Sequence, residues 1–261
     1  MLKYPLVLVH GIAAVDRWRG HEFWGPIPAA LRVRGVEPRF GRTDSWGGLD
    51  SNAAALASTV DRVLRETGAD RVNIVAHSKG GIDARAMIHS HGYGDRVASL
   101  TTVCTPHRGA ELADLALRPK GVHSPFARRA LRLFGRFFGD GNPDPYEAVR
   151  QLSTESMARF NAEARPDPAV RYRSLYTVME NPFEDALFFL SNLYLARKAG
   201  RNDGIVSAAS ARWGPESREI RAGKRGISHG AVVGMSGGKS LRDVVAGIYV
   251  SLLEELAAEG F

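Results

Sequence analysis

The chain has 261 residues, of which 44% are hydrophobic, and it carries a formal net charge of +7; this length suits one large α/β domain, so we treat residues 1–261 as a single domain. The apolar runs are too short for a transmembrane helix, which needs about 20 residues, and the only cysteine, Cys104, excludes an internal disulfide and a cysteine-based metal cage. The arginines are dispersed, without a helix-turn-helix pattern or an aromatic–basic platform, so we expect no nucleic-acid partner; the charge suits either solubility or an anionic lipid interface.

The first element is a near-continuous apolar run from Tyr4 to Val9, which is typical of a central strand covered on both faces. The run is too short for a signal peptide, so we expect a cytoplasmic protein, or a secreted one if the numbering starts at a mature terminus. The strand ends in His10-Gly11-Ile12. Gly11 lets the chain turn with its amides exposed beside the carboxyl end of the strand, where open α/β sheets bind ligands.

Two helices and a strand are predicted next. Residues 24–34 have the pattern of a helix that is broken at Gly35, and residues 36–40 that of a second strand. A long helix follows, with Asp50 or Ser51 as its N-cap and Gly68 as its end.

Residues 72–85 carry the most informative pattern. An apolar strand from Val72 to Ala76 runs into a turn at His77-Ser78-Lys79, and a helix begins at Gly80-Gly81. A serine in such a turn is forced into a sparsely allowed backbone conformation, and positions 76 and 80 must be small because the strand and the helix nearly touch there. The turn holds the hydroxyl at the N-terminus of a helix, where a developing anion is stabilised. The sequence therefore predicts Ser78 as a nucleophile.

The alternation of strands and helices continues with a strand over residues 97–103. It predicts a doubly wound, mostly parallel sheet with right-handed crossovers. Further on, the pattern predicts a helix over 151–162, a strand over 170–178, a short last strand over 218–222 and a final helix over 239–258.

The middle of the chain differs in composition. Residues 115–139 contain six basic residues and no acidic one. On a helix, Arg128, Arg132 and Arg136 would share one face and the apolar residues would fall largely on another. We predict a helical cap or lid within an insertion of about residues 113–165, which roofs the site. It either presents phenylalanines to a lipid surface or packs permanently over the sheet; those expected to meet substrate are Phe134, Phe137 and Phe138.

A nucleophilic serine needs a base within hydrogen-bond reach and a carboxylate that orients the base. After a turn of this kind, the acid and then the histidine follow on loops after late strands. Of the eight histidines, only His229 lies in a loop after the last predicted strand, so we predict it as the general base and acid. Asp203, in a glycine-flanked loop upstream, is the predicted acid; the competing carboxylates are Glu180, Glu184, Asp185 and Glu216.

The oxyanion hole is expected to consist of two backbone amides, those of Ile12 and Lys79. Changes of these side chains should therefore act by displacing the amides. We expect the Lys79 ammonium to be solvated. The neighbouring residues His10, Gly11 and His77 are expected to contact the substrate.

Five motifs occur in order along the chain: residues 7–12 (VLVHGI), 76–81 (AHSKGG) with Asp83 and Arg85, 105–109 (TPHRG), 152–154 (LST) with Phe160-Asn161, and 202–206 (NDGIV). In these motifs the chain resembles the bacterial true lipases of the Pseudomonas, Burkholderia and clostridial type, within the α/β-hydrolase superfamily. The resemblance implies the α/β-hydrolase fold and a triad of Ser78, Asp203 and His229. It also implies Ile12 and Lys79 as oxyanion donors and the hydrolysis of acylglycerols or simpler carboxylic esters.

The chain departs from this family in its metal site. Many members hold a structural calcium partly through an aspartate two residues after the catalytic histidine, and this position is Ala231 here. We therefore expect no metal and no cofactor. Glu184 or Asp185 would supply the other half of a remodelled site.

The sequence thus predicts a serine carboxylic-ester hydrolase, a lipase or esterase, that acts on ester or lipid substrates through an acyl-enzyme. Three alternatives stay open. A short-chain esterase or polyesterase and an acyltransferase would use the same triad, and a non-catalytic protein would keep the fold as a ligand pocket.

Overall fold

The computed structural model describes residues 2–18, 21–118 and 140–261. The basic helix predicted in the cap, with Phe134, Phe137 and Phe138, lies outside the described residues. The boundaries of the insertion and the single-domain assignment therefore stay predictions.

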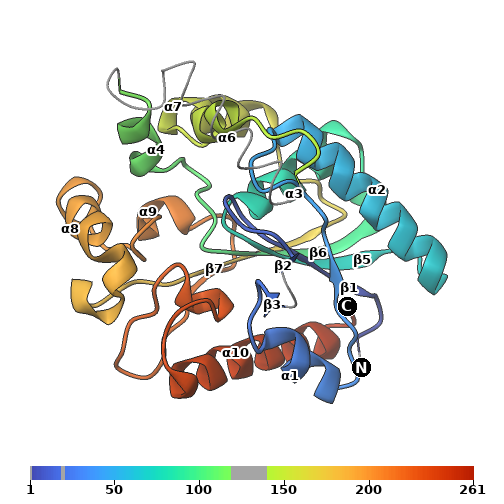
Figure 1. Cartoon of the computed structure of the whole chain (residues 1–261). Coiled ribbons are helices and arrows are strands. Elements are labelled where there is room, and N and C mark those ends of the chain that lie inside the picture. The colour runs from blue at the N-terminus through green and yellow to red at the C-terminus, as the bar shows by residue number, and fades with distance from the viewer. Residues whose placement is uncertain (1, 19–20, 119–139) are drawn as a thin grey trace.

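A six-stranded sheet runs through the molecule in the order β4-β1-β5-β6-β7-β8 (Figure 1). Every neighbouring pair is parallel, which confirms the predicted α/β-hydrolase type of sheet. The two described ends of a small hairpin, β2 (Arg17–Trp18) and β3 (His21–Glu22), pair separately. The six strands of the sheet are β1 (Leu6–Val9), β4 (Arg39–Phe40), β5 (Val72–His77), β6 (Val97–Val103), β7 (Arg171–Tyr176) and β8 (Ser217–Glu219).

Helices cover both faces of this sheet (Figure 1). On one face lie α1 (Ile27–Val33) and α10 (Lys239–Ala258), and on the other lie α2 (Leu49–Thr67) and α3 (Lys79–Ser90). The other α-helices in the described ranges are α4 (Glu111–Ala116), α6 (Pro145–Gln151), α7 (Thr154–Glu163), α8 (Phe189–Lys198) and α9 (Ala208–Ala211). Short 3₁₀ turns are η1 (Gly94–Arg96), η2 (Pro182–Glu184), η3 (Ala186–Phe188) and η4 (Ala231–Val233).

The strand β1 shows how the sheet divides the core in two. Successive side chains of a strand point to opposite faces. Leu6 and Leu8 pack with the apolar stripe of α10, whereas Val7 and Val9 pack with that of α2. All four side chains are buried. This accounts for the continuous apolar run in the sequence, because both faces of the strand are covered.

The start of α2 differs from the prediction that Asp50 or Ser51 caps it. The helix begins at Leu49 after Gly48, which has no side chain to offer as a cap. The side-chain oxygen of Gln151 accepts the Leu49 amide instead, at 2.8 Å. The first helical amide is therefore satisfied from a distant part of the chain. At the other end, Gly68 adopts a left-handed conformation with φ 71°, as the predicted stop requires.

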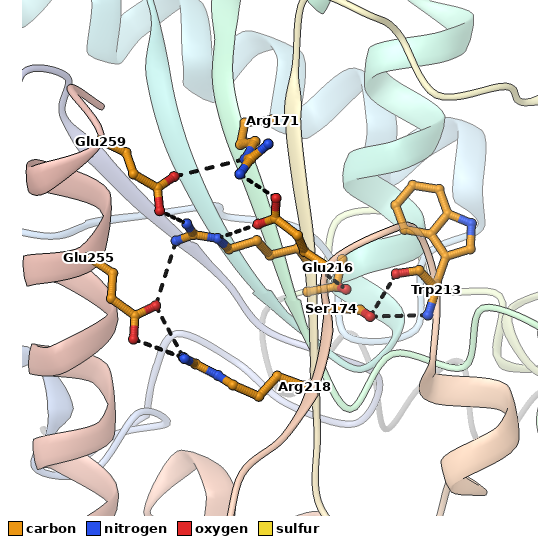
Figure 2. Close-up of polar contacts among 9 residues, drawn as sticks. Arg171, Ser174, Trp213, Glu216, Arg218, Glu255 and Glu259 are labelled. Carbon is orange, nitrogen blue, oxygen red and sulfur yellow. Dashed lines mark hydrogen bonds and ion pairs between the residues drawn. The ribbon is translucent and has the colours of Figure 1, made fainter.

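The last helix is tied to the edge of the sheet by ion pairs. Arg218 on β8 donates to Glu255 on α10 at 3.0 Å (Figure 2). The nearly buried Arg173 on β7 donates to Glu216 at 2.9 Å and also pairs with Glu259. These contacts join α10 to the last two strands of the sheet.

Within the described ranges, none of the helices combines the length and the apolar character that a membrane span requires.

Candidate active site

Ser78 sits in the sharp turn between β5 and α3. Its φ of 55° and ψ of −129° lie in a strained region for a residue with a side chain. The turn is held from both sides, because the Ser78 amide donates to the Val103 carbonyl at 2.9 Å and Thr105 Oγ1 donates to the Ser78 carbonyl at 2.8 Å. The predicted nucleophile conformation is therefore present.

Two glycines let other backbone segments approach this turn. A Cβ atom at Gly80 would lie 2.3 Å from the His10 carbonyl oxygen, and one at Gly11 would lie 2.6 Å from Ser78 Cβ. Both distances are impossible for real atoms, so each position requires glycine. The close passage of Gly11 brings the following peptide, with the Ile12 amide, next to the serine.

The structure brings Ser78, His229 and Asp203 together, although 125 residues separate Ser78 from Asp203. His229 Nε2 lies 3.0 Å from Ser78 Oγ, and His229 Nδ1 lies 2.8 Å from Asp203 Oδ2. The other carboxylate oxygen of Asp203 accepts the amides of Ile205 and Val206 at 2.9 and 2.7 Å. These two amides fix the orientation of the carboxylate, so that Oδ2 faces the imidazole.

The amides of Ile12 and Lys79 have no hydrogen-bond acceptor within the described part of the chain. Lys79 is the first residue of α3, where backbone amides lack partners in the helix and favour negative charge. Both amides thus flank Ser78 and remain able to donate to a substrate oxygen.

The expectation of a solvated Lys79 is wrong. The side chain is 1% exposed, and its Nζ donates to Asp83 Oδ1 at 2.6 Å. Asn52 Nδ2 donates to the second oxygen of Asp83 at 3.0 Å. Burial raises the pKa of the Asp83 carboxyl, while the Lys79 ammonium opposes this shift. Lysine at position 79 therefore anchors the start of α3 inside the protein.

His10 and His77 are both buried and face protein groups. His10 Nε2 lies 4.0 Å from Asp16 Oδ1. His77 Nε2 donates to the His229 carbonyl at 3.1 Å, and the two imidazole rings lie 4.5 Å apart. Burial, and next the His229 imidazole, lower the pKa of His77 well below its usual value, so His77 is neutral and does not compete for the proton of His229. Their contact with substrate stays a prediction.

The folding stability should depend on pH through His77 and His107. Both imidazoles are buried, and burial lowers both pKa values well below 6.5. Below about pH 6.5 the unfolded chain then binds more protons than the folded one, so stability is complete above this pH and is lost as the pH falls. The slope that each imidazole contributes approaches about 1.4 kcal/mol per pH unit as the pH falls below 6.5.

Urea unfolding at pH 7.5, 6.5 and 5.5 measures this slope. His107→Gln should remove the contribution of one imidazole to the slope of the unfolding free energy with pH. Replacement of the exposed His89 by Gln should leave this slope unchanged. The pKa values of Asp16 and Asp83, which burial raises, act in the opposite direction and reduce the net slope. Equal slopes in His107→Gln and the wild-type protein would contradict the prediction.

Cys104 is buried beside the triad. In the parts of the chain that the structure describes, one group of three His, Cys, Asp or Glu side chains is close enough to share a metal ion. It consists of Cys104, Asp203 and His229, whose ligand atoms lie within 4.8 Å of one another. Burial, and next the Asp203 carboxylate, raise the pKa of the thiol well above its usual value. Asp203 and His229 already bond each other, so this group is part of the triad and does not fit a metal site.

The calcium site implied by the family resemblance does not fit these residues either. Asp185 Oδ2 accepts the hydroxyls of Ser228 and Ser236 at 2.6 and 2.5 Å, and its Oδ1 accepts the Leu187 amide. The two oxygens of Glu184 accept the Gly226 and Glu180 amides. Calcium takes six to eight oxygen ligands, whereas each of these carboxylate oxygens already faces a donor. The loop that carries His229 is thus tethered by hydrogen bonds.

Sequence reasoning missed two contacts of the site. The pairing of Asp83, a residue of the second motif, with Lys79 has a signal in the four-residue spacing on one helix face. Phe188 has none: a Cβ at Gly204 would lie 2.5 Å from its Cβ, and one at Gly230 would lie 3.2 Å from its ring. Its side chain therefore packs against the loops that carry both Asp203 and His229.

Comparison with known proteins agrees with this geometry. Residues 4–140 match the family model described as alpha/beta hydrolase fold, and the chain belongs to this family. Among curated proteins it is similar to a triacylglycerol lipase of Pseudarthrobacter phenanthrenivorans, with 31% identity over 171 residues, which cover 61% of the chain and 53% of that protein. A triacylglycerol lipase of Pseudomonas fragi is 27% identical over 81% of the chain and 83% of its own length.

The solved structures add agreement in fold. The mature form of a Bacillus licheniformis lipase superposes with a TM-score of 0.71 at 23% identity, covering 96% of this chain and 92% of that one. The predicted resemblance to bacterial lipases is confirmed. The chain spans about half the length of the first curated relative that it matches.

Proposed function

We propose that the protein is a serine hydrolase of carboxylic esters, with Ser78 as nucleophile, His229 as general base and acid, and Asp203 as the orienting acid. The observation that carries the proposal is the continuous hydrogen-bond chain from Ser78 Oγ through the His229 imidazole to Asp203. The names of the curated relatives, triacylglycerol lipases, support the same reaction class.

The acylation step follows from this chain. Nδ1–H of His229 donates to Asp203, so Nε2 carries the lone pair that accepts the Ser78 proton. Ser78 Oγ attacks the acyl carbon, and the carbonyl oxygen becomes an anion that accepts the Ile12 and Lys79 amides. His229 Nε2–H then protonates the leaving alcohol oxygen. Water repeats the sequence on the acyl-enzyme and releases the acid.

Acylglycerols or related esters are the proposed substrates. Three large apolar side chains, Phe183, Leu187 and Leu190, are 81%, 74% and 77% exposed, and they are close in sequence to Phe188, which packs against the loops of Asp203 and His229. Such a surface suits an apolar acyl chain. We propose in addition that the predicted cap, with Phe134, Phe137 and Phe138, contacts the lipid interface.

We propose that the reaction needs no metal and no cofactor. The support is the donor set around Asp185 and Glu184, in which hydrogen bonds take the place of metal ligands. Calcium that bound the folded state alone would raise the melting temperature.

The test combines a serine-directed fluorophosphonate with an ester assay. We expect the probe to label Ser78, identified by peptide mapping, and to abolish hydrolysis. Rates on soluble short-chain p-nitrophenyl esters and on emulsified triolein distinguish an esterase from a lipase. EDTA and added calcium should leave rate and melting temperature unchanged. Labelling elsewhere, or ester turnover after complete labelling of Ser78, would refute the proposal.

A further inference from the structure

The loop between β4 and α2 touches the turn that holds the Ile12 amide. The amide of Ala13, the next residue, donates to the Ser45 carbonyl at 3.1 Å. Ala13 has a φ of 56°, which a residue with a side chain rarely adopts. The position of the Ser45 carbonyl therefore influences the peptide that carries one of the two proposed oxyanion donors.

Ser45 is itself held by a distant carboxylate. The Ser45 amide donates to Asp140 Oδ1 at 2.8 Å and the Trp46 amide donates to Oδ2 at 2.9 Å. The Ser45 hydroxyl lies 3.1 Å from both oxygens. Asp140 is only 6% exposed. A buried carboxylate with several charge-assisted hydrogen bonds is a rigid anchor.

A reciprocal contact joins residues 44–46 to residues 140–142. The Asp44 carboxylate accepts the amides of Gly141 and Asn142 at 2.9 and 2.7 Å. Each segment thus supplies one aspartate that binds two consecutive amides of the other. The pairing leaves the Ser45 carbonyl free to point toward Ala13.

The same loop also reaches the second oxyanion donor. Asn52 Oδ1 accepts the Asp44 amide at 3.1 Å, and Asn52 Nδ2 donates to the Asp44 carbonyl at 2.9 Å. Asn52 Nδ2 also donates to Asp83, which binds the Lys79 ammonium. Residues 44 and 45 therefore connect the Ile12 side and the Lys79 side of the site.

We propose that Asp140 is a positioning residue for the oxyanion hole, acting through Ser45 and Ala13. The inference rests on the proposed function, because it presumes that the Ile12 amide stabilises an oxyanion. Asp140 touches no substrate in this scheme. It sets the place of a peptide that does, so its loss should affect the transition state more than the ground state.

The experiment replaces Asp140 with Asn, which directs an amide group against donors. Active sites are counted by fluorophosphonate titration, so unfolded protein does not enter the rates. We expect kcat per titrated site to fall by about 10- to 100-fold and KM to stay unchanged. This loss is no larger than the one that follows the complete removal of an oxyanion donor, about 100- to 1000-fold. The Ki of an alkyl trifluoromethyl ketone, whose adduct with Ser78 bears an oxyanion, should rise by the same factor.

Asp114→Asn is the matched control. Asp114 also accepts one backbone amide and one hydroxyl, both from Thr154, at 2.9 and 2.8 Å, but it ties α4 to α7. We expect it to lower stability and to leave kcat per site and Ki unchanged. Ser45→Ala, which keeps the backbone contacts, should show a smaller loss and carries the test if Asp140→Asn does not fold.

The outcomes separate this inference from the proposed function. If the wild-type protein neither reacts with the fluorophosphonate nor hydrolyses esters, the proposed function fails. If it does both, but kcat per site and Ki of Asp140→Asn and Ser45→Ala stay within about twofold of wild type, Asp140 has no positioning role. Equal losses in Asp114→Asn would also overturn it.

Discussion

Replacing Ser78 with alanine should lower kcat for ester hydrolysis by roughly 10⁵- to 10⁶-fold, to the level that binding and the oxyanion donors alone provide. In the proposed mechanism His229 activates Ser78 Oγ, which lies 3.0 Å from its Nε2, and alanine leaves no nucleophile in its place. The variant should fold, because the bonds of the turn are made by the Ser78 backbone. Initial rates and a far-UV circular dichroism spectrum test both statements.

Ser58→Ala is the matched control for this variant. Ser58 is an exposed serine on α2 whose hydroxyl bonds only its own helix, to Ala54. Its replacement should leave the rate within about twofold of wild type, as for an ordinary surface change. Substantial turnover by Ser78→Ala, in protein free of wild-type enzyme, would mean that another residue attacks the ester.

Replacing Asp203 with asparagine should lower kcat by about 10⁴-fold, although the side chain keeps its shape. The amides of Ile205 and Val206 bind one oxygen of residue 203 and would hold the asparagine oxygen there. The NH₂ group then faces His229 Nδ1 and forces the proton onto Nε2. In this tautomer Nε2 donates to Ser78 and cannot accept its proton.

This prediction is checked by the rate of fluorophosphonate labelling, which requires the same deprotonation of Ser78. Labelling and hydrolysis should slow together in Asp203→Asn. Asn202→Asp does not serve as a control, because Asn202 braces this loop through Asn192 and Gly204. Asp185→Asn is more informative: it loosens the histidine loop without changing the tautomer, so it should cost far less than 10⁴-fold. Equal losses in the two variants would contradict the tautomer argument.

Local signals in the sequence were sufficient for the central part of the fold. The Val97–Val103 strand and the Lys239–Ala258 helix have the predicted bounds, since continuous burial and a long apolar stripe leave little ambiguity. The serine turn was predictable because its steric demands select small residues at 76 and 80, and Gly80 indeed lies against the His10 carbonyl.

Contacts between distant segments could not be read in the same way. Gln151 caps the start of α2, and Asp140 binds the loop at Ser45, each across about a hundred residues with no local pattern. The burial of Lys79 depends on the packing of α2 against α3. Helix α2 supplies Asn52, which donates a hydrogen bond to Asp83, the partner of Lys79. Edge strands were overestimated in length, because β4 and β8 pair on one side only and need few residues.

Because Cys104 is buried next to the triad, the reactivity of its thiol depends on whether the structure around the triad is intact. The single thiol lies within 4.8 Å of the nearest side-chain ligand atoms of Asp203 and His229 and is fully buried. Burial raises its pKa well above the usual value, so the thiol is protonated and inaccessible to alkylating reagents in the folded structure. A reagent can meet it only when the structure around the triad opens. Modification of the thiol therefore requires loss of the triad geometry. The rate at which Cys104 reacts with a thiol reagent consequently measures how often the structure around the triad opens.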